Sequence, residues 1–343
     1  MNIAREHFGT LPGGKEVSRY ILENRNGMEV RVMDYGAAIT HLIVPGRGNE
    51  PGDVVLGFDR LEDYLGDQPY FGAVCGRFCN RIGGSSFVID GTRYSLSANE
   101  GSNHLHGGFR GFDKQLWQVD TDISAEEACL VMTYQSRDGE EGYPGNLTAE
   151  VTYSLNDNNE LGISFRAQTD RSTHVNLTNH SYFNLNDCRG TILRHELTLY
   201  ADRYTVLDSE NIPTGEIAPV QDTPFDFRKA RPLGEKMEQV APGYDLNFVL
   251  SVGSGELTPA AVLHDPVSGR TMEVLTTLPG IQLYTANYVK GIRGKEGMVY
   301  EPHSAVCLET QYFPDTPNRE HFPSTLLKPG EAFAAKTVFR FSI

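Results

Sequence analysis

The chain has 343 residues, of which 39% are hydrophobic and 22% charged, and its 30 basic and 45 acidic residues give a formal net charge of −15. A chain of this length buries about three quarters of its extended surface on folding, so it can build a large core without disulfides or structural metals. The acidic balance argues against binding nucleic acid, whose phosphates require clustered Lys and Arg, and it favours a neutral small-molecule substrate.

The cysteines and the N-terminus indicate a cytoplasmic protein. Five cysteines are too few and too scattered to frame a secreted disulfide fold. The first residues contain no apolar core of a signal peptide. No stretch approaches the ~18 consecutive apolar residues of a membrane span, so we expect no contact with a membrane.

Hydrophobic residues recur with a period of two along most of the chain, which is typical of β-strands with one buried face. The first strands are expected at 29–34 and 38–44, and Asp90-Gly91 predicts a type I′ hairpin turn between 87–89 and 92–94. A long hairpin is predicted at 147–155 and 161–167, joined by the turn residues 156–159. Further strands are expected at 129–135, 196–200, 261–265, 271–277, 281–286, 305–312 and 335–342.

Helical patterns are weak, and only 226–239 is expected to contain one or two helical turns. Without amphipathic helices between the strands, a βαβ architecture is excluded. No linker, charge block or internal repeat marks a domain boundary. We therefore predict an all-β fold, a large antiparallel β-sandwich with few short helices that forms a single domain over residues 1–343.

Several familiar motifs are missing. The sequence has no GxGxxG after a strand, no P-loop, no HExxH zinc motif and no GxSxG nucleophile elbow. No cofactor, no metal and no activated nucleophile are therefore expected.

Two predicted strands carry polar residues that an ordinary solvent-exposed strand face rarely combines. In 175–185, alternation places Asn176, Thr178, His180, Tyr182 and Asn184 on one face, which suits a cleft that hydrogen-bonds a polyol. An ordinary exposed face or a hydrogen-bonded buried histidine would give the same pattern.

In 305–312, Glu309 shares a face with small and thiol side chains. Burial there would raise the pKa of its carboxyl group toward the range useful for proton transfer. An edge-strand Glu paired with a Lys is the structural alternative.

Three glycine-flanked clusters supply further polar candidates. Arg77 and Arg81 bracket Asn80, His106 precedes two glycines that permit close approach of a ligand, and Asp245 follows a turn. Each of these residues taken singly is also compatible with a purely structural role.

These blocks together resemble the aldose 1-epimerase family. The matching blocks are NRI at 80–82, NHLHGG at 103–108, NLTNHSYFNL at 176–185, GYDLNF at 243–248, PGIQLYTAN at 279–287 and LETQYFPDTPN at 308–318. One departure is Cys79, at a position where the family usually has Ala. The resemblance implies a β-sandwich with the sugar in an open cleft and no cofactor.

The resemblance also implies the roles of individual residues. Glu309 would be the base that takes the proton of the C1 hydroxyl, and His180 the acid that protonates the ring oxygen. The remaining positions would bind the sugar, with Arg81, His106 and Asp245 in contact and Asn80, Tyr182 and Gln282 nearby. At neutral pH this interpretation has the carboxylate ionised and the imidazole able to give up a proton.

The function implied is interconversion of the α and β anomers of free galactose and glucose, supplying the anomer used in galactose metabolism. The alternatives are a glucose-6-phosphate 1-epimerase-like enzyme, a non-catalytic sugar-binding module on the same scaffold, and a glycoside hydrolase with paired carboxylates. We expect no partner other than the hexose, and a monomer, with a homodimer as the alternative.

Overall fold

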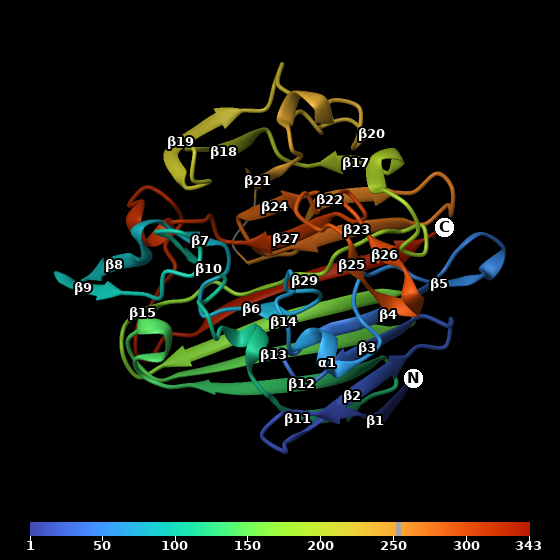
Figure 1. Ribbon diagram of the computed structural model, residues 1–343, viewed down its shortest axis with the longest axis horizontal. Helices are drawn as coiled ribbons and strands as arrows, with labels where there is room; N and C mark the ends of the chain where they lie inside the picture. The colour runs from blue at the N-terminus through green and yellow to red at the C-terminus, as the bar shows by residue number, and fades with distance from the viewer. Residues whose placement is uncertain (252–254) are drawn as a thin grey trace.

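The computed structural model describes residues 1–251 and 255–343, and 46% of the residues lie in β-strands that form antiparallel sheets (Figure 1). The largest sheet has nine strands, which pair in an order that returns the C-terminal strand to the middle. In spatial order they are β11 (Gln118–Ile123), β12 (Glu127–Ser136), β13 (Leu147–Asn156), β14 (Glu160–Thr169), β29 (Phe333–Ser342), β23 (Thr271–Thr276), β22 (Thr258–His264), β17 (Glu196–Leu199) and β20 (Arg231–Pro232).

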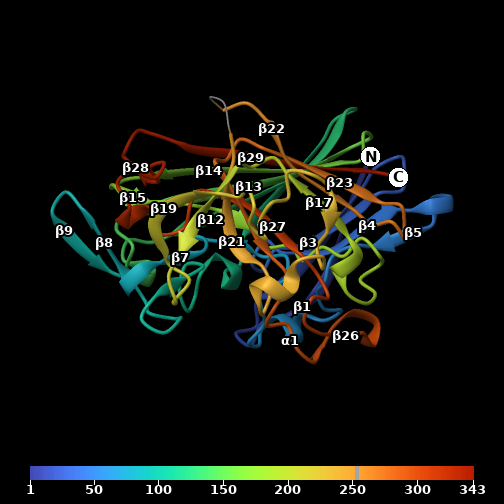
Figure 2. The same ribbon diagram turned by 90° about the horizontal axis from the view of Figure 1, so that it is seen from above.

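Two five-stranded sheets accompany the large sheet (Figures 1 and 2). The N-terminal sheet contains β1 (Asn2–Thr10), β2 (Glu16–Glu23), β3 (Glu29–Met33), β4 (Ile39–Pro45) and β5 (Pro51–Asp53). The second, which we call the site sheet, runs in the order β19 (Pro213–Pro219), β18 (Arg203–Leu207), β21 (Asp245–Val249), β24 (Gly280–Tyr284) and β27 (Cys307–Gln311).

Short two-stranded ladders and single helical turns make up the connections. The ladders pair β6 (Val74–Cys75) with β16 (Thr178–Asn179), β7 (Arg81–Ile82) with β10 (His104–Leu105), β8 (Ser86–Ile89) with β9 (Thr92–Ser95), β15 (Thr173–His174) with β28 (Leu326–Leu327), and β25 (Ile292–Arg293) with β26 (Val299–Tyr300). The helical turns are α1 (Leu61–Tyr64), η1 (Arg47–Asn49), η2 (Gly83–Ser85), η3 (Phe112–Lys114), η4 (Glu140–Gly142), η5 (Ile192–Arg194), η6 (Met237–Val240), η7 (Lys295–Gly297) and η8 (Thr316–Asn318).

One continuous hydrophobic cluster connects the three large sheets. It includes Val30 from the N-terminal sheet, Tyr153 from the nine-stranded sheet and Leu283 from the site sheet, all of them fully buried. Each sheet therefore turns one face inward, as the period-two pattern predicts. The predicted fold class, an antiparallel β-sandwich with few short helices, is confirmed.

The individual strand predictions agree closely with the structure. The long hairpin forms β13 and β14, and its predicted inward residues are buried along most of both strands. The Asp90-Gly91 turn joins β8 to β9 with a positive φ at both residues, as a type I′ turn requires. The segment 226–239 contains one helical turn, η6, together with the short strand β20. Strands β1, β2, β11, β18, β19 and β21 were not predicted, nor were the short strand β5 and most of the short strands of two residues.

No helix in the described part of the chain is long and apolar enough to cross a membrane.

The packing of β13 can be tested with one substitution on each of its faces. Leu155 is fully buried, whereas the neighbouring Ser154 is only half-buried. Leu155→Ala should lower the free energy of unfolding in urea by about 2–5 kcal/mol, because it leaves a cavity in the core. Ser154→Ala, the matched control, should change it by less than about 0.5 kcal/mol. Equal losses in the two variants would contradict this assignment of faces.

Candidate active site

The site sheet places three candidate residues on its outer face. Register pairs Gln282 of β24 directly with Glu309 of β27, and Asp245 lies two residues before Asn247, the partner of Gln282 on β21. The intervening residues, such as Leu246 and Leu283, belong to the hydrophobic cluster on the other face. Because side chains alternate across a strand, burial of these leucines in the core turns Asp245, Gln282 and Glu309 to the outer face of the sheet. We call these three residues the polar row.

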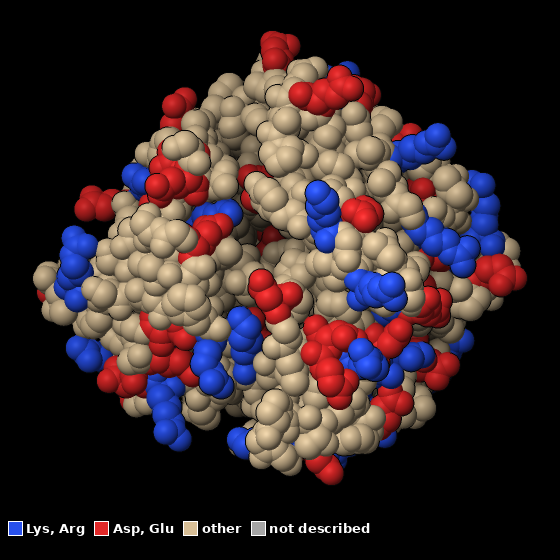
Figure 3. All heavy atoms as spheres, viewed as in Figure 1, with Lys and Arg blue, Asp and Glu red and all other residues tan. Residues whose placement is uncertain are grey.

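The polar row forms the floor of a cavity of about 210 Å³. The face of the molecule that carries β7, β10 and β27 is hollowed near its middle, and acidic side chains are visible inside the hollow (Figure 3). Seven of the eight predicted site residues line the cavity: Asn80, Arg81, His106, His180, Tyr182, Asp245 and Glu309. The eighth, Gln282, is buried behind Asp245, and its Nε2 donates a hydrogen bond of 2.7 Å to Asp245 Oδ1.

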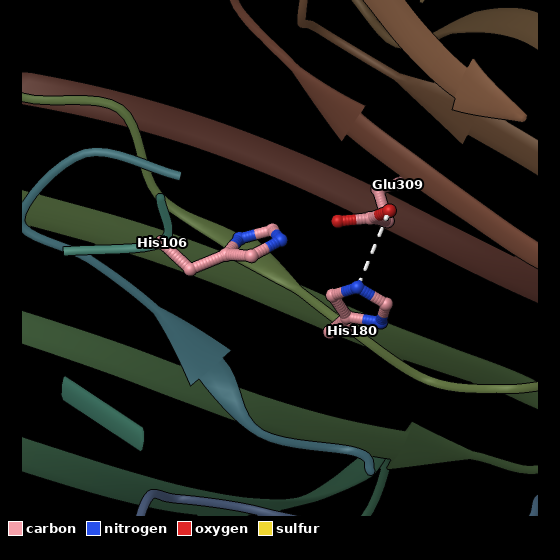
Figure 4. Close-up of side chains that lie close together, drawn as sticks. All are labelled: His106, His180 and Glu309. Atoms are coloured by element: carbon pink, nitrogen blue, oxygen red, sulfur yellow. Dashed lines mark ion pairs between the residues drawn. The ribbon is translucent and has the colours of Figure 1, made fainter. Parts of the chain in front are cut away.

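His180 and Glu309 meet inside this cavity although 128 residues separate them in sequence. His180 follows the short strand β16, and its Nε2 lies 3.6 Å from Glu309 Oε1 (Figure 4). The distance is longer than a direct hydrogen bond. Both side chains are almost fully buried, with 5% and 2% of their surfaces exposed. The cavity therefore holds an acid–base pair shielded from bulk water.

Burial shifts the pKa values of the pair in opposite directions. It raises the pKa of Glu309 to about 8, an effect that the nearby Asp245 carboxylate strengthens and Arg81 opposes. It lowers the pKa of His180 to about 4. At neutral pH the free pair therefore carries one proton, and that proton resides on Glu309. The raised pKa of Glu309 agrees with the sequence-based expectation that burial would raise it, whereas the expectation of an ionised carboxylate at neutral pH is not met, because burial outweighs the attraction of Arg81.

His106 is clamped by the loop that carries Asn80. The backbone N–H of Asn80 donates to the ring nitrogen Nδ1 of His106 at 3.2 Å, and the backbone N–H of His106 donates to the Asn80 carbonyl at 3.0 Å. Since Nδ1 accepts a hydrogen bond, the proton of the neutral ring is on Nε2. The ring thus offers a hydrogen-bond donor to the cavity.

The clamp also bears on metal binding. His106, His180 and Glu309 have ligand atoms within 4.8 Å of one another, a grouping that would suit a transition metal. A metal on His106 Nε2 would require a proton on Nδ1, directly against the Asn80 N–H. The geometry therefore fits hydrogen bonding to a ligand better than it fits a metal.

Arg81 is the cation of the cavity, and it is held by two carboxylates. Its Nε and Nη2 each donate to Glu100 at 2.7 Å, a bidentate pair, and its Nη1 lies 3.8 Å from Asp245 Oδ2. Bidentate pairing fixes the plane of the guanidinium. Arg81 and Asp245 therefore present a donor and an acceptor side by side at the cavity wall.

For most of the polar face in 175–185 and for Arg77, the structure favours the structural alternative. The polar comb in 175–185 does not face a ligand as a whole: Asn176 bonds the backbone of Tyr312, Thr178 the carbonyl of Thr310 and Asn184 the carbonyl of Ser304. These residues attach the segment to the strand that carries Glu309 and to its flanks. Arg77 points away from the cavity, since its guanidinium donates to the Pro144 and Gly145 carbonyls and to Ser136.

The cavity also contains residues that the sequence patterns did not single out. They are Pro69, Tyr70, Glu100, Leu105, Tyr284 and Tyr288. Tyr284 alternates with Gln282 on β24, so its place on the same face could have been predicted. Glu100 and Tyr70 lie in loops, where no periodicity indicates which way a side chain points.

The matching family model and several relatives similar in sequence are described as aldose 1-epimerases or galactose mutarotases. The family model described as aldose 1-epimerase matches residues 18–340. The galactose mutarotases of Bos taurus and Homo sapiens are each 47% identical, over all of this chain and 99% of theirs. The aldose 1-epimerase of Escherichia coli K12 is 33% identical over 96% of both chains.

Solved structures agree with the sequence relatives. The galactose 1-epimerase of Lactobacillus acidophilus NCFM superimposes with a TM-score of 0.88 at 27% identity, covering 99% of this chain and 98% of its own. A GalM/aldose epimerase homologue from C. elegans gives a TM-score of 0.87 at 30% identity, covering 94% and 98% respectively.

Proposed function

The chain belongs to the aldose 1-epimerase family and is an isomerase that acts on carbohydrates, and from this premise we propose how its own residues interconvert the anomers of a free hexose. The single observation that carries the proposal is the buried His180–Glu309 pair, 3.6 Å apart at the floor of a cavity sized for one small ring.

The chemistry of mutarotation requires such a pair. Opening the ring removes a proton from the C1 hydroxyl, breaks the bond between C1 and the ring oxygen, and delivers a proton to that oxygen. Both oxygens are bonded to C1, so the acid and the base must be close neighbours. A nucleophile or cofactor is not needed, because no electrons leave the sugar.

Glu309 and His180 take the two roles. When the ring opens, Glu309 accepts the proton of the C1 hydroxyl and the His180 imidazolium gives its proton to the ring oxygen. The aldehyde then rotates about the C1–C2 bond by about half a turn, and the two transfers reverse to close the ring on the other face. Each group contributes about 10²–10⁴-fold.

The electrostatics of the buried pair favour the opened state. Opening begins with the proton on His180 and ends with a proton on Glu309, which is the arrangement that burial prefers. Both arrangements have the same net charge, so none has to enter or leave the buried pair. The site is complementary to the costly intermediate rather than to the closed sugar.

The remaining residues hold the sugar around this pair. Arg81 and the Nε2–H of His106 donate hydrogen bonds to sugar oxygens, and Asp245 accepts from hydroxyl groups away from C1. Gln282 keeps the Asp245 carboxylate in place through its 2.7 Å hydrogen bond. Asn80 and Tyr182 complete the wall next to the two histidines.

The sugar is unphosphorylated and the site is catalytic. Among the described residues that line the cavity, Arg81 is the only cation, and Glu100 and Asp245 already neutralise it. A phosphate group would need further Arg or Lys contacts. A pure sugar-binding module would not need a buried histidine with a lowered pKa next to a buried glutamate with a raised pKa.

The same molecule is proposed to act as a cytoplasmic monomer with one domain over residues 1–343. All five cysteines lie in the described part of the chain and are free thiols, which suits a reducing compartment. One hydrophobic cluster runs through all three large sheets, as in one folding unit.

Removing the base tests the assignment directly. Glu309→Gln keeps the size of the side chain but cannot accept a proton, so the catalysed decay of optical rotation of fresh α-galactose should slow by about 10²–10⁴-fold. Glu320→Gln, on the exposed surface, is the matched control and should retain full activity. Near-normal activity in Glu309→Gln would rule out its role as the base.

The pH profile tests the shared proton. The pair works only while it carries one proton, so kcat/KM should be flat between about pH 4 and pH 8. Below this window His180 and Glu309 are both protonated, and above it neither is. Polarimetry across this range, corrected for the spontaneous rate, checks both limbs. An alkaline limb at about 6.5, the ordinary pKa of His, would show that burial does not raise the pKa of Glu309.

The charge of the cavity predicts selectivity against phosphorylated sugars. The kcat/KM for glucose should exceed that for glucose 6-phosphate by at least about tenfold, because a dianion meets the carboxylates of Glu100 and Asp245 and an Arg81 that they already neutralise. Parallel polarimetric assays on the two sugars measure the ratio. A preference for the phosphorylated sugar would favour the glucose-6-phosphate 1-epimerase alternative.

A further inference from the structure

Tyr70 covers the end of the cavity where the acid and the base lie. Its ring centroid is 4.7 Å from that of His106 and 5.9 Å from that of His180, and its plane is within 21° of the His180 ring. Tyr182 stacks on His180 as well, at 4.9 Å and 17°. Since Tyr70 lines the same cavity as Glu309, one aromatic ring borders both imidazoles and the space around the base.

The backbone of Tyr70 is strained in a way that serves this placement. Its φ is +59°, in the left-handed region that a bulky residue rarely adopts. The turn is fixed by the Tyr70 N–H, which donates to the Gln68 carbonyl at 2.9 Å, and by the Ala73 N–H, which donates to the Tyr70 carbonyl at 3.0 Å. Strain of this kind costs about 1–3 kcal/mol and persists where the surroundings impose it.

The turn is also joined directly to His180. The His180 N–H donates to the Ala73 carbonyl at 2.9 Å, and the Gly72 N–H donates to the His180 carbonyl at 3.0 Å. The ammonium of Lys114 lies 5.9 Å from the centre of the Tyr70 ring and donates to the Phe109 carbonyl at 3.0 Å. Such a cation is attracted to the ring and helps to hold it.

We propose that Tyr70 is a positioning residue for the epimerase reaction: its ring holds the imidazoles of His106 and His180 in place and excludes water from the reacting end of the cavity. This rests on the proposed function of the acid–base pair and adds to it. The hydroxyl group of Tyr70 takes no part, because stacking and water exclusion depend on the ring alone.

Exclusion of water has a measurable consequence at His180 and Glu309. Their pKa shifts arise mainly from burial, so solvent admitted at this end should return both toward their ordinary values. Other charged or titratable groups face this end from the neighbouring elements, and replacing Tyr70 does not remove any of them. They are Arg81, Glu100, His106, Asp113, Lys114, Tyr182, Asp245, Tyr284, Cys75 and Cys307.

Tyr70→Gly is the informative variant, because glycine adopts a φ of +59° without strain and the turn should keep its shape. We expect kcat to fall by about tenfold while KM changes by less than about threefold, since Arg81 and Asp245 are held by Glu100 and Gln282 and not by Tyr70. The flat region of the pH profile should narrow, because the pKa of His180 rises from near 4 and that of Glu309 falls from near 8. With both groups at their ordinary pKa values, the two limbs would lie at about 4.3 and about 6.5.

Three further variants make the result decisive. Tyr70→Phe keeps the ring and should rescue both limbs and most of the rate. Tyr70→Asn, which also tolerates the left-handed region, should behave like Tyr70→Gly and serves if that variant fails to fold in a thermal unfolding test. Asp222→Gly relieves an equal φ of +60° at an exposed site and should leave the profile unchanged.

Two outcomes would overturn the proposal. Unchanged pH limbs in Tyr70→Gly and Tyr70→Asn would show that the ring does not exclude water. A loss in Tyr70→Phe equal to that in Tyr70→Gly would show that the hydroxyl group, not the ring, matters. Neither result affects the assignment of the base, which the Glu309→Gln assay tests on its own.

Discussion

The location of a single proton is the constraint on which this site depends. His180 and Glu309 lie 3.6 Å apart where both charged forms are penalised by burial, so the pair holds one proton and prefers it on the carboxyl group. In the proposed mechanism, ring opening moves a proton to that carboxyl group and takes one from the imidazole. The low dielectric of the cavity thus supplies the driving force that a metal or cofactor supplies in other enzymes, and it does so only while water is kept away.

The sandwich builds this environment by turning one face of a sheet into core and the other into the floor of the cavity. Leu246 and Leu283 pack inward, and the residues next to them on the same strands, Asp245 and Tyr284, line the cavity. A one-residue slip in register would exchange the two faces, so the hydrophobic core itself enforces the polar row. The walls come from loops, and three wall residues, Tyr70, Asn80 and His106, have a positive φ. Strain is therefore concentrated where side chains must converge on a small ligand.

Alternation made much of this architecture predictable. The β13–β14 hairpin, the turn at Asp90-Gly91 and the outward position of Glu309 all follow from a period of two and from turn chemistry, which are local properties. The motif blocks identified the same eight site residues, and seven of them line one cavity while Gln282 supports it from behind. Alternation misled where a segment is not a regular strand: in 175–185 most polar side chains bond neighbouring backbone instead of a ligand.

By itself, then, the amino-acid sequence determined the class of fold, the inward and outward faces of the long strands, and which residue types carry the chemistry. Only the tertiary structure decided that residues 180 and 309 share one proton, that Glu100 orients Arg81, and that Tyr70 covers the imidazoles. The physical reason is that periodicity reports local geometry, whereas desolvation, pairing and stacking depend on which distant segments meet. A protonation state belongs to an environment, and that environment exists only once the chain has folded.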